Sequence, residues 1–276
     1  MNIDGKLRTM RTLSLTVTGF ALLLLLAGIA QLGVGGIAVS AEYDRIEQRE
    51  ALMGSPRTYY GYQQQQRQIQ AEYDRSSSAF FLEGRFLQTS LDGDTSLYAK
   101  IAFGTFLFAV LGFLVSALGW VWRATANLRD VGIRMKYGPG FITASYLIPI
   151  ANLVIPFESM RELHNRSHGE GDDFAHSGVE NVTAWWTSLL TGLLIFSALV
   201  MKFVVDAGTN LILMTPLWME FAIMCFAVVL LLVAAWLFAN LTREITAAQQ
   251  EVLPQVDPSA HEEVAPARPT VTIVGG

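Results

Sequence analysis

Four apolar runs, each long enough to cross a hydrocarbon core as a helix of about 20 residues, constrain this chain more than any other feature of its sequence. The runs cover residues 13–39, 98–122, 182–205 and 211–239. Hydrophobic residues make up 52% of the chain and charged residues only 16%, whereas about 25% of the residues in soluble domains are charged. The sequence therefore predicts an all-α, polytopic helical membrane protein with four transmembrane helices.

A fifth apolar segment, residues 141–157, is near the lower length limit for a crossing and contains Pro149 and Pro156. Proline interrupts the hydrogen-bond ladder of a helix, and lipid cannot satisfy the freed backbone groups. The segment is therefore a half-helix, a kinked helix or an element buried against its neighbours. We predict a re-entrant or interfacial element, with a full crossing as the alternative.

Basic residues near the ends of the runs predict the orientation, because cytoplasmic loops are enriched in Lys and Arg. These residues are Lys6, Arg8, Arg11, Arg123, Arg129, Arg134, Lys136, Arg161, Arg166 and Arg243. With four spans they all fall on one side, and both termini are cytoplasmic. A full crossing by 141–157 would instead place Arg243 and the C-terminal tail outside.

Tryptophan placement agrees with this orientation, since Trp is enriched at membrane interfaces. Trp218 falls at the proposed outer end of the last span. The tryptophans at the proposed cytoplasmic ends are Trp120, Trp122, Trp185, Trp186 and Trp236.

The remaining sequence divides into soluble pieces around the spans. Residues 1–40 form a cytoplasmic N-terminus and the first span; the alternative, a cleaved signal peptide, has a shorter apolar core of about 7–15 residues. Residues 41–97 are predicted to form an extracytoplasmic helical hairpin, with arms ending near 53 and running over about 58–88, because apolar positions there recur at helical spacing. Residues 251–276 are proline-rich and predict a disordered cytoplasmic tail.

Candidate chemistry is sparse. His164 and His168 stand four residues apart, a spacing that suits a transition metal on a helix, with His176, Glu170, Asp172 and Asp173 nearby. Gly169 and Gly171 interrupt any helix there, so we interpret the stretch as a solvated connector and predict no metal, cofactor or catalytic site.

Charged residues and a row of small residues also fall within the apolar runs. We interpret Glu220 as stabilised near the N-terminus of the last helix and Lys202 as extending to the headgroups. Small residues on one face of the second span indicate a helix-packing seam. They are Gly104, Gly112, Ser116 and Gly119.

The region from about 98 to 250 resembles an uncharacterised bacterial membrane family, domain of unknown function 4328. The resemblance rests on Trp122-Arg123-Ala124, Asn127-Leu128, Tyr137-Gly138-Pro139-Gly140, Ile148-Pro149-Ile150-Ala151-Asn152-Leu153, Pro156, Trp185-Trp186 and Ile245-Thr246-Ala247-Ala248-Gln249. It implies a multi-pass domain of a bacterial cytoplasmic (inner) membrane. It implies no activity and transfers no catalytic residues, and residues 141–146 depart from a family pattern richer in tryptophan.

Within this motif, Arg123, Asn127 and Asn152 are the polar candidates, together with Pro149 and Pro156, which break the segment. Asn152 stands between the prolines and can both donate and accept hydrogen bonds. Arg123 and Asn127 are one helical turn apart, able to reach the same broken element or a lipid phosphate. The residues form either an internal clamp on the half-helix or a ligand, lipid or ion site.

We expect a non-enzymatic membrane protein that binds a partner, senses a condition or serves as a scaffold, with 41–97 as the region for a membrane or extracytoplasmic protein. The alternatives are a lipid or small-solute binding or transport component built on the broken segment, and a membrane enzyme. We expect the lipid bilayer as a partner and no nucleic acid.

Overall fold

The structure is a computed structural model that describes residues 3–53, 63, 93–148, 150–170, 179–208 and 216–255. All regular elements within these residues are helices. Four stretches are long and apolar enough to cross a membrane: Gly5–Asp44, Leu97–Asp130, Glu180–Val205 and Leu217–Gln255. The predicted all-α fold with four transmembrane helices is therefore confirmed.

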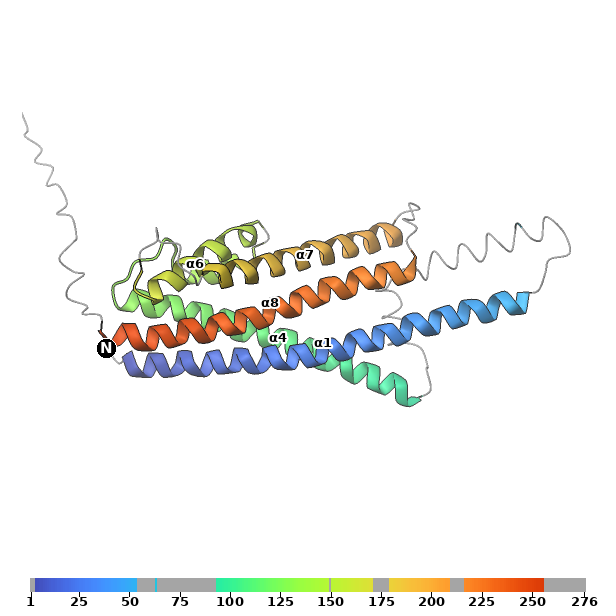
Figure 1. Ribbon diagram of the computed structural model, residues 1–276, viewed down its shortest axis with the longest axis horizontal. Coiled ribbons are helices and arrows are strands. Elements are labelled where there is room, and N and C mark those ends of the chain that lie inside the picture. Colours follow the sequence, from blue (N-terminus) through green and yellow to red (C-terminus); the bar gives the residue numbers. More distant parts are fainter. Residues whose placement is uncertain are drawn as a thin grey trace, which may run out of the picture. The chain divides into compact units, whose positions relative to one another are not determined.

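The chain divides into two compact units, each built from segments far apart in the sequence. We call Met1–Ser14, Leu118–Val179 and Thr242–Gly276 the polar unit, and Leu15–Ala117 and Glu180–Leu241 the apolar unit. Three helices contribute residues to both units: α1 (Ile3–Met53), α4 (Gly93–Asp130) and α8 (Leu217–Val252) (Figure 1). Almost all of α7 (Val179–Gly208) belongs to the apolar unit, whereas α5 and α6 belong to the polar unit.

The apolar unit is a helical bundle in which α8 contacts each of the other three helices. Leu24 of α1, Ala109 of α4 and Leu232 of α8 meet in a buried cluster. The ring of Phe238 on α8 lies 5.9 Å from that of Phe113 on α4 and 5.5 Å from that of Trp185 on α7. Each helix thus buries part of its apolar surface against α8.

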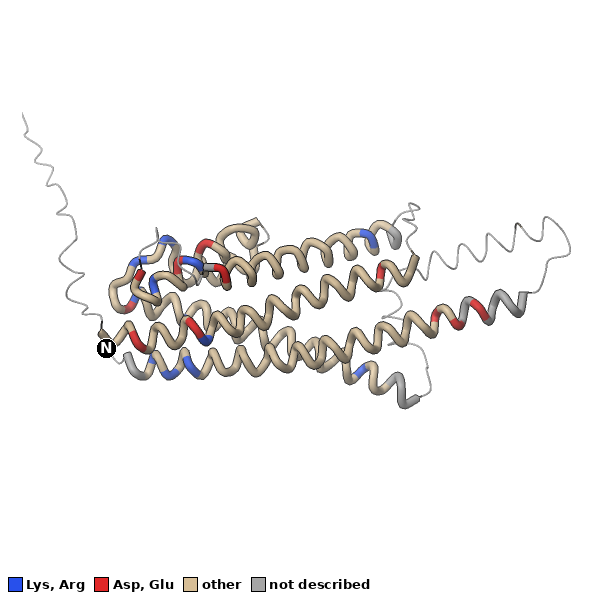
Figure 2. The backbone as a smooth tube through the Cα atoms, viewed as in Figure 1, with Lys and Arg blue, Asp and Glu red and all other residues tan. Residues whose placement is uncertain are grey.

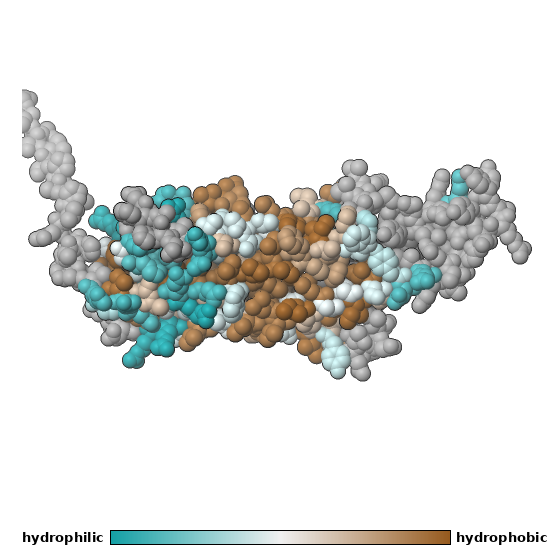
Figure 3. Space-filling view, in the orientation of Figure 1, coloured by the Kyte–Doolittle hydropathy of each residue, from teal (hydrophilic) through white to brown (hydrophobic). Residues whose placement is uncertain are grey.

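Each helix of the apolar unit contributes a stretch without charged residues: 15–41, 101–117, 181–201 and 221–241 (Figure 2). The outward side chains on these stretches are apolar as well, for example Leu26 and Val115, which are 69% and 72% exposed. Figure 3 accordingly shows hydrophobic surface over these helices. An outer surface of this kind is compatible with lipid on all sides.

Lys202 and Glu220 form an ion pair between α7 and α8. Lys202 Nζ lies 3.2 Å from Glu220 Oε2, and the two side chains are 11% and 2% exposed. The prediction that Lys202 extends to the headgroups is therefore wrong, because its ammonium group is held by a carboxylate inside the bundle.

The predicted packing seam on the second span is present at Gly112. A Cβ atom at Gly112 would overlap the ring of Phe20 on α1, whereas one at Gly104 would meet nothing within 4 Å. We expect Gly112→Ala to destabilise the protein by about 1–3 kcal/mol through overpacking. Gly104→Ala is the matched control and should be neutral or slightly stabilising, because alanine is the better helix former.

Thermal unfolding of the two variants in detergent measures this difference. Equal melting temperatures for Gly112→Ala and Gly104→Ala would contradict the assignment of Gly112 to a close helix contact.

In the polar unit, the segment predicted as one broken element is resolved into two helices and a turn. α5 covers Pro139–Ser145, the 3-10 turn η1 covers Ala151–Leu153, and α6 covers Ile155–Ser167. Both α5 and η1 pack against α6. Pro156 lies in the first turn of α6, where a missing N–H costs no helical hydrogen bond. Pro149 lies outside the described residues.

The backbone groups around the break bond to one another through turns. The N–H of Asn152 donates to the Ile148 carbonyl oxygen at 2.7 Å, and that of Val154 to the Ala151 oxygen at 3.2 Å. Main-chain hydrogen bonds therefore pair these backbone groups around the break.

The helices extend beyond the predicted spans. α1 ends at Met53, as predicted for the first arm of the hairpin, while the second arm lies outside the described residues apart from residue 63. α8 continues to Val252 and is followed by the 3-10 turn η2 (Leu253–Gln255), so the helical part enters the predicted tail. Residues 256–276 lie outside the described residues.

The six tryptophans differ in exposure. Trp122 and Trp218 are exposed, as expected for membrane interfaces, Trp236 is half-buried, and Trp120, Trp185 and Trp186 are buried. The buried rings contribute to helix packing, a role that position along the sequence alone does not distinguish from interfacial placement.

Candidate functional site

A fully buried glutamine is at the centre of the polar unit. Gln249 of α8 donates from Nε2 to the Ala124 carbonyl oxygen of α4 at 3.1 Å and to Ser167 Oγ of α6 at 3.0 Å. Its Oε1 accepts a hydrogen bond from Asn127 Nδ2 at 3.4 Å. One side chain thus joins three helices.

Asn127 extends this network to the first helix. Its Nδ2 also lies 3.3 Å from Met10 Sδ of α1, and only 3% of the residue is exposed. Its Oδ1 is buried without a hydrogen-bond partner among the described residues. The contacts support the clamp interpretation for Asn127, which reaches α6 through Gln249 and Ser167.

Side-chain hydrogen bonds tie α8 to α4 and α1 as well. Trp120 Nε1 donates to Thr246 Oγ1 at 3.1 Å, and Ser14 Oγ to Thr242 Oγ1 at 3.4 Å. Because buried polar groups without partners are costly, these paired groups fix how the helix segments of this unit pack.

The other predicted site residues do not join this network. Arg123 is half-buried, and its Nε has no hydrogen-bond partner among the described residues. Asn152 is half-buried in η1, and Pro156 is buried at the start of α6. The structure thus brings Asn127 into the core and leaves the Arg123 and Asn152 side chains outside its hydrogen bonds.

The loop between α4 and α5 is held on α6 by two carboxylates. The Glu162 carboxylate accepts the backbone N–H of Lys136, at 2.8 Å to Oε1, and Glu158 Oε2 lies 2.9 Å from Lys136 Nζ. The hydrogen bond to Glu158 raises the pKa of the Lys136 ammonium group, so Lys136 stays charged.

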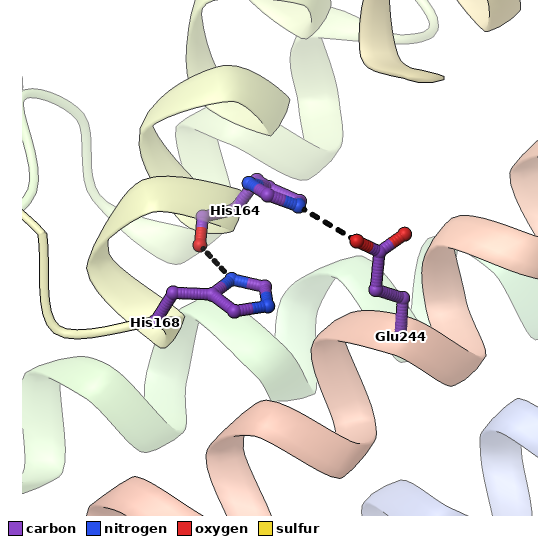
Figure 4. Close-up of side chains that lie close together, drawn as sticks. All are labelled: His164, His168 and Glu244. Carbon is purple, nitrogen blue, oxygen red and sulfur yellow. Dashed lines mark hydrogen bonds and ion pairs between the residues drawn. The ribbon is translucent and has the colours of Figure 1, made fainter. Parts of the chain in front are cut away.

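Three donor side chains from α6, its C-terminal cap and α8 come together beside this core (Figure 4). His164 is 4% exposed, and its Nε2 lies 3.2 Å from Glu244 Oε1. The ring of His168 lies 4.4 Å from that of His164. One donor atom from each of His164, His168 and Glu244 lies within 4.8 Å of the others.

The interpretation of this stretch as a solvated connector is wrong up to Ser167, because Arg161–Ser167 form the second half of α6 and mostly face the core. The spacing of His164 and His168 was the available signal. Glu244 was missed because it lies 80 residues from His164 in sequence, within the last long helix.

A family model described as "Domain of unknown function (DUF4328)" matches residues 92–247. The matched region includes α4, α5, η1, α6, α7 and most of α8, and with them His164, His168 and Glu244. Comparison with curated proteins found no match, and comparison with solved structures found none.

Proposed function

Since the chain belongs to the DUF4328 family, whose description names no activity, we propose from its structure that it is a non-enzymatic scaffold or sensor of the membrane. One observation carries this proposal: α6 is tied to α4 and α8 through buried hydrogen bonds of Gln249, while the adjoining α5–η1 segment exposes apolar side chains. A segment that packs against a firmly held helix and exposes apolar side chains is suited to binding.

The residues that we call the apolar face run from α5 through η1 to the N-cap of α6. Its exposed members are Phe141 (48%), Leu147 (71%), Ile148 (45%), Ile150 (84%), Leu153 (50%) and Val154 (55%). In water such a face would be unfavourable, since apolar surface gains about 25 cal/mol per Å² on burial. In our proposal both termini are cytoplasmic. The apolar face inserts at the cytoplasmic interface of the membrane, where it binds a helix of another membrane protein.

A lipid-binding function is the second candidate, and exposed basic residues favour it. Arg129, Arg134 and Lys136 lie at the end of α4 and in the loop before α5, and all three are exposed. Basic residues near an anionic membrane surface contribute about 1 kcal/mol each. The same apolar face would then hold acyl chains.

Site-specific photocrosslinking in native membranes tests these two candidates. A photoreactive residue at position 150 should yield covalent adducts with a protein, because Ile150 is 84% exposed. The matched control is position 142 on α5, since Ile142 is 1% exposed and should yield none. Adducts with lipid alone would favour the second candidate, and the absence of adducts from position 150 would contradict both.

A further inference from the structure

We propose that His164, His168 and Glu244 bind one transition-metal ion, with Zn²⁺ as the best fit to the donors. This inference goes beyond the scaffold or sensor function and does not depend on the apolar face. Imidazole nitrogen and carboxylate oxygen are ordinary ligands of zinc, and three protein ligands leave a fourth position for water.

The hydrogen bond of His168 presents its second nitrogen as a ligand. Nδ1 lies 2.8 Å from the His164 carbonyl oxygen, and because a carbonyl oxygen only accepts, Nδ1 carries the proton. In the neutral imidazole, Nε2 then has a free lone pair. Figure 4 shows Nε2 on the side of the ring toward Glu244. Metal-binding histidines commonly have such a second bond, which fixes their tautomer and orientation.

The spacing of the donors suits a tetrahedral ion. His164 Nε2 and Glu244 Oε1 are 3.2 Å apart, and two ligands bound to zinc at about 2.0–2.1 Å are separated by about 3.3 Å in tetrahedral geometry. All three donors lie within 4.8 Å. The Glu244 side chain is 37% exposed, so a shift of this carboxylate can close the remaining distance while His168 keeps its hydrogen bond.

The end of α6 positions His168 for this role. His164 and His168 are one helical turn apart, and α6 stops at Ser167. Gly169 has a φ of 76°, and the N–H of Glu170 donates to the Asn165 carbonyl oxygen at 2.9 Å. This is a Schellman turn, which glycine adopts without strain. The turn holds His168 at the C-cap, beside His164.

Coordination would join α6 to α8 by bonds stronger than the present contact between His164 and Glu244. His164 is 5% exposed in its side chain and Glu244 is 37% exposed. The site is thus buried at His164 and open to water at Glu244. The open side gives an ion a route of entry and leaves a place for a bound water.

Metal binding by the full chain in detergent tests the proposal, with an affinity tag that contains no histidine. Zn²⁺ should bind at one ion per chain, and Co²⁺ should give the intense visible absorption of tetrahedral coordination. His168→Ala and Glu244→Gln should each weaken binding at least about tenfold. His261→Ala removes a histidine from outside the three-residue group and should bind as the unchanged protein does.

His168 is exposed and Glu244 partly exposed, so these two variants should fold even if the buried His164 tolerates no substitution. A full chain that binds no zinc would overturn the proposal. Unchanged zinc affinity in either His168→Ala or Glu244→Gln would also overturn it, because the ion would then be held elsewhere.

Discussion

Lys202→Met alone should lower the free energy of unfolding by about 3–5 kcal/mol, because it leaves the carboxylate of Glu220 without its cation inside the bundle. The Glu220 side chain is 2% exposed and lies 3.2 Å from Lys202 Nζ. Loss of the monodisperse protein on heating in detergent measures the effect. Lys100→Met, at an exposed lysine of α4, is the matched control and should change stability by less than about 0.5 kcal/mol.

The double variant Lys202→Met with Glu220→Leu gives the sharper test. Replacing both members of a buried ion pair by apolar residues is often neutral or stabilising. The double variant should therefore be more stable than Lys202→Met. If its destabilisation equals the sum of the two single changes, the side chains do not interact, and the pairing of α7 with α8 through these charges is contradicted.

Gln249→Leu should destabilise the protein by about 2–4 kcal/mol, since it keeps most of the side-chain volume but removes hydrogen bonds to α4 and α6. Asn127 and Ser167 would lose a buried partner, and each unsatisfied buried group costs about 1–3 kcal/mol. Gln250→Leu is the control, because Gln250 is the adjacent residue of the same type and is exposed. The same thermal measurement compares the two.

Asn127 provides an independent check on the network. If Gln249→Leu acts by leaving Asn127 unpaired, then Asn127→Leu combined with Gln249→Leu should cost less than the sum of the single changes. Additive losses would show that the two amides contribute separately. A Gln249→Leu protein as stable as Gln250→Leu would contradict the central place of Gln249.

The membrane helices could be predicted because hydropathy and length suffice for them. The ends of those helices could not. α8 leaves its apolar run after Ala239 but continues to Val252. Beyond the run, the buried residues of α8 are Leu241, Thr242, Ile245, Thr246, Ala248 and Gln249. A polar helix face that pairs with other helices resembles an exposed one in sequence, and only the fold distinguishes them.

The candidate site could be predicted only in part, because the residues that meet there are far apart in sequence. Asn127 could be selected as a polar residue at the end of a span, but its partner Gln249 lies 122 residues away in sequence. The break at Pro156 could be predicted from the residue itself, because proline favours the first turn of a helix. Whether Asn152 or the main chain would satisfy the neighbouring backbone groups depended on the turn at η1, which no local pattern specified.

The contacts of Asn127 also define which stretch of chain can be excised as an independently folding piece. Its Nδ2 contacts Met10 and Gln249, whereas the family match covers residues 92–247. A fragment cut at the family boundaries would lose both contacts, one before its first residue and one after its last. We therefore expect the cooperatively folding stretch to extend beyond the family boundaries, to the N-terminal end of α1 and the last turns of α8.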